Sequence, residues 1–231
     1  MLVPLTRRKF EEVLPLAATG PQYAYYWGDW QNLVKQVLFS LGGVLLVWLS
    51  SGLFQSSGLT LFLAIVAGLY WLWGPVAKAS LRNARYRRYP YSGFWQGKIL
   101  DLYVTEEVIG TEETANQRGE LVVVENCERR LNLKIGDETG FVAKVQVPLQ
   151  RQHQLLAIDR TVQTIVLSED RDLRRIAKIA DLYVPNRNVW VSDYPWLERG
   201  AFVEVSRRLG TLNRATGDRS TRQRRPMRRS Q

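Results

Sequence analysis

The residue types that most often perform chemistry are scarce in this chain of 231 residues. Its single histidine, His153, lies between two glutamines, and its single cysteine, Cys127, lies between a predicted strand and a charged turn. One cysteine cannot form an intrachain disulfide, and one cysteine with one histidine does not supply the ligand set of a zinc site. Nothing close to Cys127 in the sequence provides the adjacent base that a nucleophilic thiolate needs. We therefore interpret Cys127 as an ordinary residue at a strand end.

The carboxylates do not suggest an enzyme either. Two acidic pairs, Glu106-Glu107 and Glu112-Glu113, fall in a polar segment that also contains Gly110. Carboxylates that act as acid and base need desolvated and unequal surroundings, which a solvated loop does not give. No glycine-rich phosphate loop is present, because the Gly42-Gly43 pair falls inside an apolar run. The sequence predicts a protein that is not an enzyme and has no cofactor, no metal site and no small-molecule substrate.

The most informative segment carries no charge from Gln36 to Ala77. Two apolar runs, Val37–Phe54 and Leu59–Ala77, flank a polar turn at 55–58. Each run would form a helix of about 27–29 Å, close to the ~30 Å hydrocarbon core of a bilayer. Because a backbone in lipid must satisfy its own hydrogen bonds, the pattern predicts a two-helix transmembrane hairpin. Two buried helices of a soluble protein are the alternative interpretation.

Basic residues lie on both sides of this segment and are absent from its turn, so both termini are expected on the cytoplasmic or stromal side. Tyrosines and tryptophans gather at the same two ends, as in an interfacial aromatic belt, and no ligand motif supports a pigment or quinone site. The spans lack the charges typical of a transport pathway. Small residues within them are interpreted as helix-packing positions, and Ala64 with Gly68 forms a small-xxx-small pair. These positions are Gly42, Gly43, Ala64 and Gly68.

The region after the spans alternates between apolar and polar residues as strands do. Residues 130–135 and 141–147 alternate on either side of a turn with two glycines, which predicts a β-hairpin. Residues 171–182 have apolar positions at helical spacing and predict the single helix of this domain. Residues 189–191 and 201–205 are predicted as closing strands. The expected fold class is an α+β membrane protein with a transmembrane hairpin and a mostly antiparallel β-domain, either a small barrel or a pleckstrin-homology-like sheet.

The last 25 residues hold most of the positive charge. The chain has a net charge of +10, and its segment 207–231 contains nine arginines against one aspartate, a net +8. Such a segment buries too little apolar surface to fold alone. We expect it to contact anionic lipid headgroups or an acidic protein, which we favour over nucleic acid because no aromatic residues interleave the arginines. The residues expected to make these contacts are Arg207, Arg208, Arg222, Arg224, Arg225, Arg228 and Arg229.

Three segments carry a resemblance: GFWQGKILDLYV, DLYVPNRNVWVSDYPWLERGAFVEV, and the N-terminal FEEVLPLA with YYWGDW. Together they resemble an uncharacterised family of cyanobacterial and plastid membrane proteins. The expected architecture is also similar to that of plastid-encoded photosystem I assembly proteins. The resemblance implies a location in the thylakoid membrane or the cytoplasmic membrane, and it implies no catalytic residues.

The sequence thus predicts four regions: an interfacial segment (1–32), the hairpin (33–78), a cytosolic or stromal β-rich domain (79–206) and a disordered tail (207–231). The predicted function is a non-enzymatic membrane anchor that binds other proteins, assembling or stabilising a photosynthetic membrane complex such as a photosystem or its intermediate. The alternatives are an adaptor whose basic tail recruits an acidic partner or RNA, and an accessory subunit of a transporter. The candidate protein interface is Tyr194 with an exposed Trp196, whereas Trp190 is expected in the core.

Overall fold

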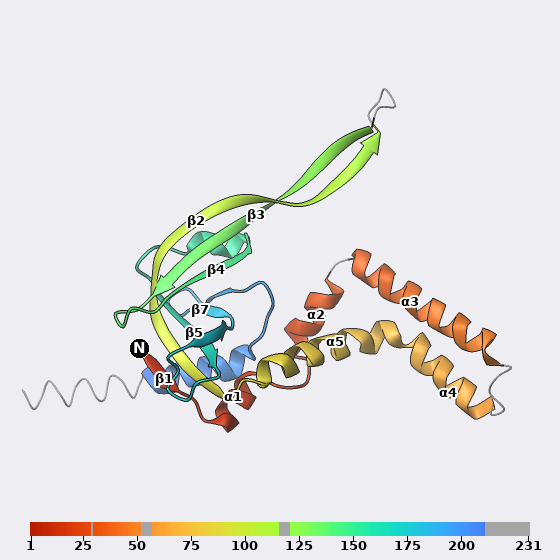
Figure 1. Cartoon of the computed structure of the whole chain (residues 1–231), viewed down its shortest axis with the longest axis horizontal. Coiled ribbons are helices and arrows are strands. Elements are labelled where there is room, and N and C mark those ends of the chain that lie inside the picture. The colour runs from red at the N-terminus through yellow and green to blue at the C-terminus, as the bar shows by residue number, and fades with distance from the viewer. Residues whose placement is uncertain (29, 52–56, 116–120, 211–231) are drawn as a thin grey trace, which may run out of the picture.

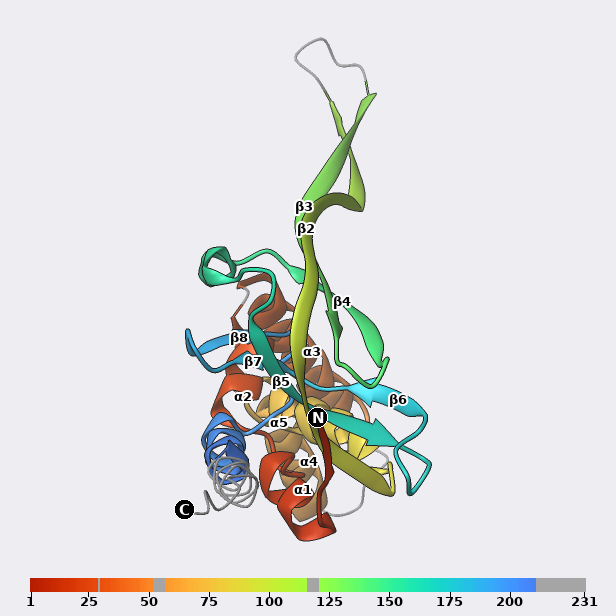
Figure 2. The same cartoon turned by 90° about the vertical axis from the view of Figure 1, so that its left-hand side faces the viewer.

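A computed structural model describes residues 1–28, 30–51, 57–115 and 121–210 of the chain. A curved antiparallel sheet forms the body of the protein (Figure 1). Helices α2 to α5 form a helical unit that extends away from this body, and part of β2 and β3 forms a long two-stranded arm (Figures 1 and 2). The strands are β1 (Leu2–Pro4), β2 (Tyr91–Ala115), β3 (Leu121–Gly136), β4 (Val142–Pro148), β5 (Thr161–Ser168), β6 (Ile176–Ile179), β7 (Leu182–Val184) and β8 (Val189–Val191).

The strand order is β4-β3-β2-β5-β7-β8, with β1 added to β2 and β6 added to β5. The predicted hairpin is confirmed, because β3 pairs with β4 from Arg130 opposite Pro148 to Gly136 opposite Val142. The predicted strand at 189–191 is confirmed as β8. Strand β2 passes from pairing with β5 to pairing with β3 beside Gly97, where an added Cβ would lie 2.3 Å from the carbonyl oxygen of Gly136. The ring of Trp95 also lies 2.3 Å from that Cβ position, so only glycine fits there without a shift of its neighbours.

The core has two parts, one on each face of β5. Ile165 and Leu167 point to one face, and Val162 and Val166 point to the other. The first face is covered by α1 (Arg7–Val13) and by a helix at 199–210, which contributes Phe202. The second face is closed by the curled ends of the sheet itself. Both faces of β5 are thus buried, and this includes its polar residues Gln163, Thr164 and Ser168.

The helical unit comprises α2 (Gly20–Trp27), α3 (Trp30–Leu49), α4 (Ser57–Gly68) and α5 (Tyr70–Arg87). The predicted two-helix transmembrane hairpin is wrong. The second apolar run is not one helix, since it breaks at Leu69 and α5 turns from α4 by 70°. With 12 residues, α4 is only about 18 Å long, too short to cross a bilayer. In the part of the chain that is described, α3 alone is by itself long and apolar enough to span.

The break has an identifiable local cause. The first N–H groups of any helix lack intrahelical acceptors. At the start of α5 the N–H of Trp71 donates to the hydroxyl of Ser40 on α3, at 3.0 Å. This contact stabilises a new helix start in the middle of the apolar run. Composition does not reveal it, because Ser40 lies 31 positions earlier in the sequence.

Two further predicted elements are wrong. Residues 171–182 do not form a helix, because they contain β6 and the beginning of β7, and Leu173 has a φ of 56°. Residues 201–205 are not a strand, because they lie in the helix at 199–210. The β-domain therefore has more than the one helix predicted, and the N-terminal segment is part of it, since β1 and α1 pack against the sheet.

Candidate functional site

The largest apolar surface of the protein covers α3 and α4. Large side chains on α3 are widely exposed, including Leu38, Phe39, Leu46 and Trp48 at 61–72%. Only 11% of the apolar window of α3 is buried, so α3 is not a core helix of the body. On α4, Leu61 and Phe62 are exposed to a similar degree. A monomeric soluble protein rarely exposes apolar surface over two whole helices.

The helix pair is held together by small residues. A Cβ added to Gly43 would lie 3.1 Å from the Cβ of Ala67, and one added to Gly68 would lie 3.4 Å from a methyl of Val44. Gly43 and Gly68 therefore lie where α3 and α4 approach each other. Gly42 has open space around its Cβ position, and Ala64 is half-buried on α4. Of the predicted packing positions, the structure brings Gly43 and Gly68 together across this contact.

A buried amide pair joins the helical unit to the body. Gln22 of α2 and Asn83 of α5 are both fully buried, and each donates to the other at 3.1 and 2.8 Å. The amide of Gln22 also donates to the carbonyl oxygen of Trp196 at 3.2 Å. Two helices and the loop after β8 are thereby fixed at one point. Because buried amides are costly without partners, this contact specifies how α2 and α5 are placed.

Aromatic rings extend the same junction. Tyr86 of α5 stacks on Trp196 with ring centroids 3.5 Å apart. The guanidinium of Arg82 lies over the rings of Tyr194, at 4.0 Å, and Trp196, at 4.7 Å. Tyr194 is fully buried and Trp196 is 9% exposed, so the expected exposure of Trp196 is not observed. Both residues of the candidate protein interface therefore contact the helical unit of their own chain, while Trp190 lies in the core as expected.

Asp181 supports this loop from inside the body. It is 1% exposed, and its two carboxylate oxygens accept the backbone N–H groups of Trp196 at 3.0 Å and Leu197 at 3.1 Å. Burial outweighs these hydrogen bonds and raises the pKa of Asp181 to about 7. Asp181 thus holds the backbone of the aromatic junction in place.

A third contact fixes the end of α5. Arg7 of α1 donates to the carbonyl oxygens of Tyr89 at 3.0 Å and Arg87 at 2.9 Å, and Arg87 pairs with Glu11 at 2.9 Å. The guanidinium of Arg7 thus satisfies carbonyls at the C-terminal end of the helix, where positive charge is favoured. The hydrogen bonds from Arg7 and Arg87 lower the pKa of Glu11. The helical unit and the body are therefore connected by several independent contacts.

The arm is the second prominent surface. Beyond the end of β4, residues 106–115 of β2 pair only with residues 121–129 of β3, over about 33 Å. These two segments contain six glutamates and one arginine. Exposed apolar side chains on the arm include Val108, Ile109 and Val123. The arm also carries Cys127, which is exposed.

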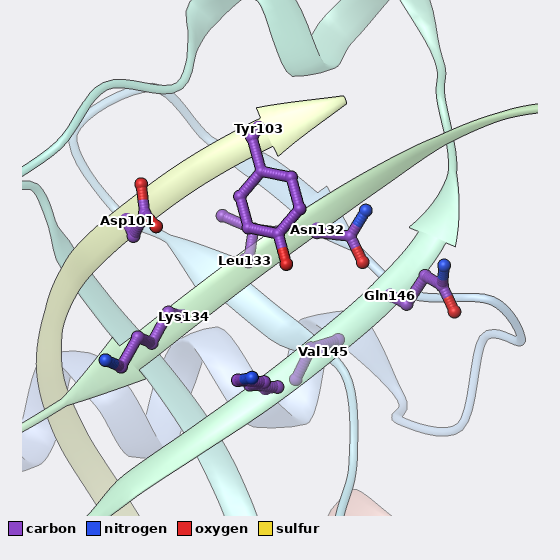
Figure 3. Close-up of a pocket in the computed structure, with 8 residues that line it drawn as sticks. Asp101, Tyr103, Asn132, Leu133, Lys134, Val145 and Gln146 are labelled. Atoms are coloured by element: carbon purple, nitrogen blue, oxygen red, sulfur yellow. The ribbon is translucent and has the colours of Figure 1, made fainter. Parts of the chain in front are cut away.

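A shallow hollow of 420 Å³ lies at the base of the arm, on the outer face of β2, β3 and β4 (Figure 3). Its polar groups include Asp101, Lys134 and Lys144, with Tyr103 standing over the neighbouring strand. The Asp101 carboxylate accepts the N–H of Leu102 at 2.8 Å and is exposed. We find no desolvated acid–base pair among these side chains.

The remaining predicted positions are dispersed. His153 is 3% exposed, and burial lowers its pKa. No group of three or more histidine, cysteine, aspartate or glutamate residues in the described ranges could hold a metal ion. Arg207 and Arg208 lie in the helix at 199–210, where Arg208 pairs with Glu204. The other predicted tail arginines, Arg222, Arg224, Arg225, Arg228 and Arg229, lie outside the described residues.

Sequence reasoning missed the residues that build the junction. Gln22 and Asn83 look like ordinary polar helix positions, and their pairing spans 61 positions. The one feature of the sequence that could indicate this contact is Asn83 itself, an uncharged amide within the arginine-rich second half of α5. Asp181 carried no signal, because it was placed in a predicted helix that the structure does not contain.

Comparison with known proteins gives one match. The model of a "Family of unknown function (DUF8619)" matches residues 3–220. No curated protein and no solved structure matches the chain. The matched range includes the sheet body, the helical unit and the arm, so these parts occur together in the family pattern.

Proposed function

Because the chain belongs to DUF8619, a family of unknown function, its role is inferred from its surfaces, and we propose that it is a membrane-anchored protein that presents a binding arm to a partner protein. The observation that carries the proposal is the exposed apolar surface of α3 and α4, which the body leaves uncovered. In this proposal the helical unit is embedded through α3, with α4 packed beside it. The sheet body and its arm remain in the aqueous phase.

The distribution of the apolar side chains favours lipid over a partner helix. Leu38, Phe39, Leu41, Leu46 and Trp48 point in directions that cover about half of the circumference of α3, at 3.6 residues per turn. A docking helix covers a narrower stripe. The opposite side of α3 packs on α4 and α5, so the surface left exposed is the one that lipid would surround.

Aromatic and basic residues follow in the order expected of a membrane boundary. Trp27 packs on Trp71 at the base of α3, with ring centroids 5.6 Å apart, and Tyr70 packs edge-on against Trp73. The cations of α5 begin only beyond this aromatic layer, at Lys78. Interfacial rings followed by lysine and arginine are typical of the aqueous edge of a bilayer.

The arm is the part of the body best shaped to contact another protein. It stands clear of the sheet, and its charge is strongly acidic apart from Arg129. Its exposed apolar residues Val108, Ile109 and Val123 lie among these glutamates. This combination suits a partner with a basic surface and apolar contacts. Because the sequence resemblance implies a thylakoid location, assembly of a photosynthetic membrane complex is the specific form of this proposal.

The anchoring is tested by Leu45→Asp with Leu46→Asp. Replacing leucine by aspartate near the middle of an inserted helix costs about 3–4 kcal/mol per position. We expect the wild-type chain to stay in the membrane pellet after a carbonate wash and the double variant to be released. The matched control is Leu155→Asp with Ile158→Asp, two comparably exposed apolar residues on the body, which should stay in the pellet. Release of the wild type by carbonate would refute the anchoring.

The partner is tested by co-purification in a mild detergent. Recovery of photosystem subunits or assembly intermediates with the protein would support a role in assembling a photosynthetic complex. Recovery of ribosomal components would point to the adaptor function, and recovery of transporter subunits would point to an accessory subunit of a transporter. We expect Glu106→Gln with Glu107→Gln, on the arm, to weaken the complex. The charge-matched control, Glu169→Gln with Asp172→Asn on the body, should leave it unchanged. Equal co-purification of both double variants would remove the arm from the proposal.

A further inference from the structure

A second feature of the helical unit is an apolar groove at the α4–α5 break. The groove has a volume of 440 Å³ and is lined by Trp27 of α2, by Val37, Ser40 and Leu41 of α3, and by Gly68 and Trp71 at the break. Its only hydroxyl, that of Ser40, accepts the N–H of Trp71. Apart from the buried indole N–H of Trp27, the rest of the lining is apolar, so the groove suits a hydrocarbon chain.

The groove lies next to a group of cations on α5. Trp71, Lys78 and Arg85 are spaced by seven residues, so they lie on one face of the helix, about 10 Å apart. Lys78 and Arg85 are exposed and border a second hollow of 490 Å³, together with Tyr26. Tyr26 and Trp27 are consecutive residues of α2. The cationic hollow therefore continues along α5 from the apolar groove.

The charges of this region are strongly one-sided. Between residues 13 and 90 the sequence has six lysines and arginines and only one acidic residue, Asp29. Lys78 lies 5.9 Å from the ring centroid of Tyr70, so it lies beside aromatic rings near the groove. The half-buried Arg82 adds a third positive charge to the same hollow, although its guanidinium lies over the junction rings. A negatively charged headgroup complements this surface.

One polar group at the groove also lacks a partner. The indole N–H of Trp27 is buried and has no acceptor among the described residues. Buried donors normally find one. This donor is inaccessible to solvent and does not indicate a ligand. The apolar groove and the cations beside it correspond to the acyl chain and the headgroup of one lipid molecule.

We propose that the groove at the α4–α5 break, with Lys78 and Arg85 beside it, is a binding site for one anionic glycerophospholipid. One acyl chain occupies the groove between α3 and Trp71, and the phosphate contacts the two cations of α5. The site would bind an individual lipid more tightly than the general apolar surface of α3 does. This inference rests on the proposed membrane anchoring, and the test below separates the two.

The test measures lipid retention by the purified full chain in a non-ionic detergent, using native mass spectrometry. The probes are dioleoyl phosphatidylglycerol, dioleoyl phosphatidylcholine with the same acyl chains, and glycerol 3-phosphate, which has the phosphate alone. We expect retention of one phosphatidylglycerol per chain, weaker retention of phosphatidylcholine and none of glycerol 3-phosphate. Equal retention of the two phospholipids, or binding of glycerol 3-phosphate alone, would overturn the proposal.

Two pairs of variants locate the site. Lys78→Gln with Arg85→Gln should weaken phosphatidylglycerol binding about fivefold for each cation removed, and should leave phosphatidylcholine unchanged. The control, Lys98→Gln with Lys178→Gln, removes two exposed cations of the sheet and should have no effect.

Leu41→Trp fills the groove and should weaken the binding of both lipids, whereas Leu46→Trp, on the outer face of α3, should not. Unchanged binding in the Lys78/Arg85 or the Leu41 variant would refute the site. Lipid retention in detergent by a wild-type chain that carbonate releases from membranes would refute the anchoring alone.

Discussion

The buried carboxyl of Asp181 makes a specific prediction about pH. Its pKa is raised to about 7 in the folded protein, against 3.8 for a solvated aspartate, because burial disfavours its charged form. In the unfolded chain the group ionises near its ordinary pKa. Asp181 therefore favours the folded state most at low pH, and this advantage is lost as the pH rises from about 4 to about 7.

The magnitude follows from the difference between the two pKa values. A difference of about three pH units corresponds to about 4 kcal/mol, lost at about 1.4 kcal/mol per pH unit. Above pH 7 the carboxyl is ionised in both states, so no further change is expected from it. His153 acts in the opposite direction, since its lowered pKa makes the folded state gain stability as the pH rises towards 6.5.

Asp181→Asn isolates the contribution of the carboxyl. The amide cannot ionise, so the variant should lack the loss of stability between pH 4 and 7, while His153 contributes equally to both proteins. At low pH the variant should be less stable than the wild type by about 1–3 kcal/mol. In the wild type the carboxyl accepts two backbone N–H groups, whereas the NH₂ group of asparagine cannot accept a hydrogen bond and leaves one of them unpaired. At pH 8 and above the variant should equal or exceed the wild type. The two stability curves are therefore expected to cross.

The assay is urea unfolding of the full chain in detergent, followed by tryptophan fluorescence at pH 4.5, 6, 7 and 8.5. The difference in the free energy of unfolding between variant and wild type is the quantity of interest, and it should change sign across this range. A constant difference at all four pH values would refute the reasoning. It would mean that Asp181 is ionised throughout and that its two hydrogen bonds outweigh its burial.

Two further changes test packing in the same unfolding assay. Gln22→Leu leaves the buried amide of Asn83 without its partner and should lower the free energy of unfolding by about 1–3 kcal/mol. Adding Asn83→Leu in a double variant should restore part of this loss. If the effects of the two substitutions on the free energy of unfolding were fully additive, that result would contradict the contact. Gly97→Ala forces a Cβ to 2.3 Å from the carbonyl oxygen of Gly136 and should lower the free energy of unfolding by about 3 kcal/mol or more. The control, Gly42→Ala, has open space at its Cβ and should not lower it. Equal stability of the two alanine variants would argue against the close contact at Gly97.

Local patterns predicted the parts of the fold that depend on neighbouring residues. The hairpin at 130–147 follows from alternation around a glycine-bounded turn, and both its strands pair as expected. Residues 201–205 of the helix at 199–210 resemble a strand because they form a short, mostly apolar run with two valines. Its buried residues Phe202, Val205 and Ser206 nevertheless have helical spacing, so the correct signal was present over a longer window.

Features set by distant contacts could not be predicted in this way. Residues 171–182 have helical spacing, but Ile176 and Ile179 of this segment pair in β6 with β5 instead. Pairing with an existing strand outweighs weak helix propensity. The break at Leu69 depends on Ser40, and the junction depends on Gln22 meeting Asn83. For the same reason, the candidate interface at Trp196 was placed on the surface, although it is covered by α5.

The position of the helical unit within the chain affects how the protein folds. Strand β1 pairs with β2 in a register that places Leu2 opposite Trp95, and the whole helical unit lies between them in sequence. During synthesis β1 and α1 emerge before their partner strand, which does not exist until α5 is complete. Closing so long a loop is slow, and docking α2 on α5 shortens it by bringing Gln22 to Asn83. We therefore expect placement of the helical unit to precede completion of the sheet, with Phe10 and Val13, which are buried in the folded protein, left exposed until then.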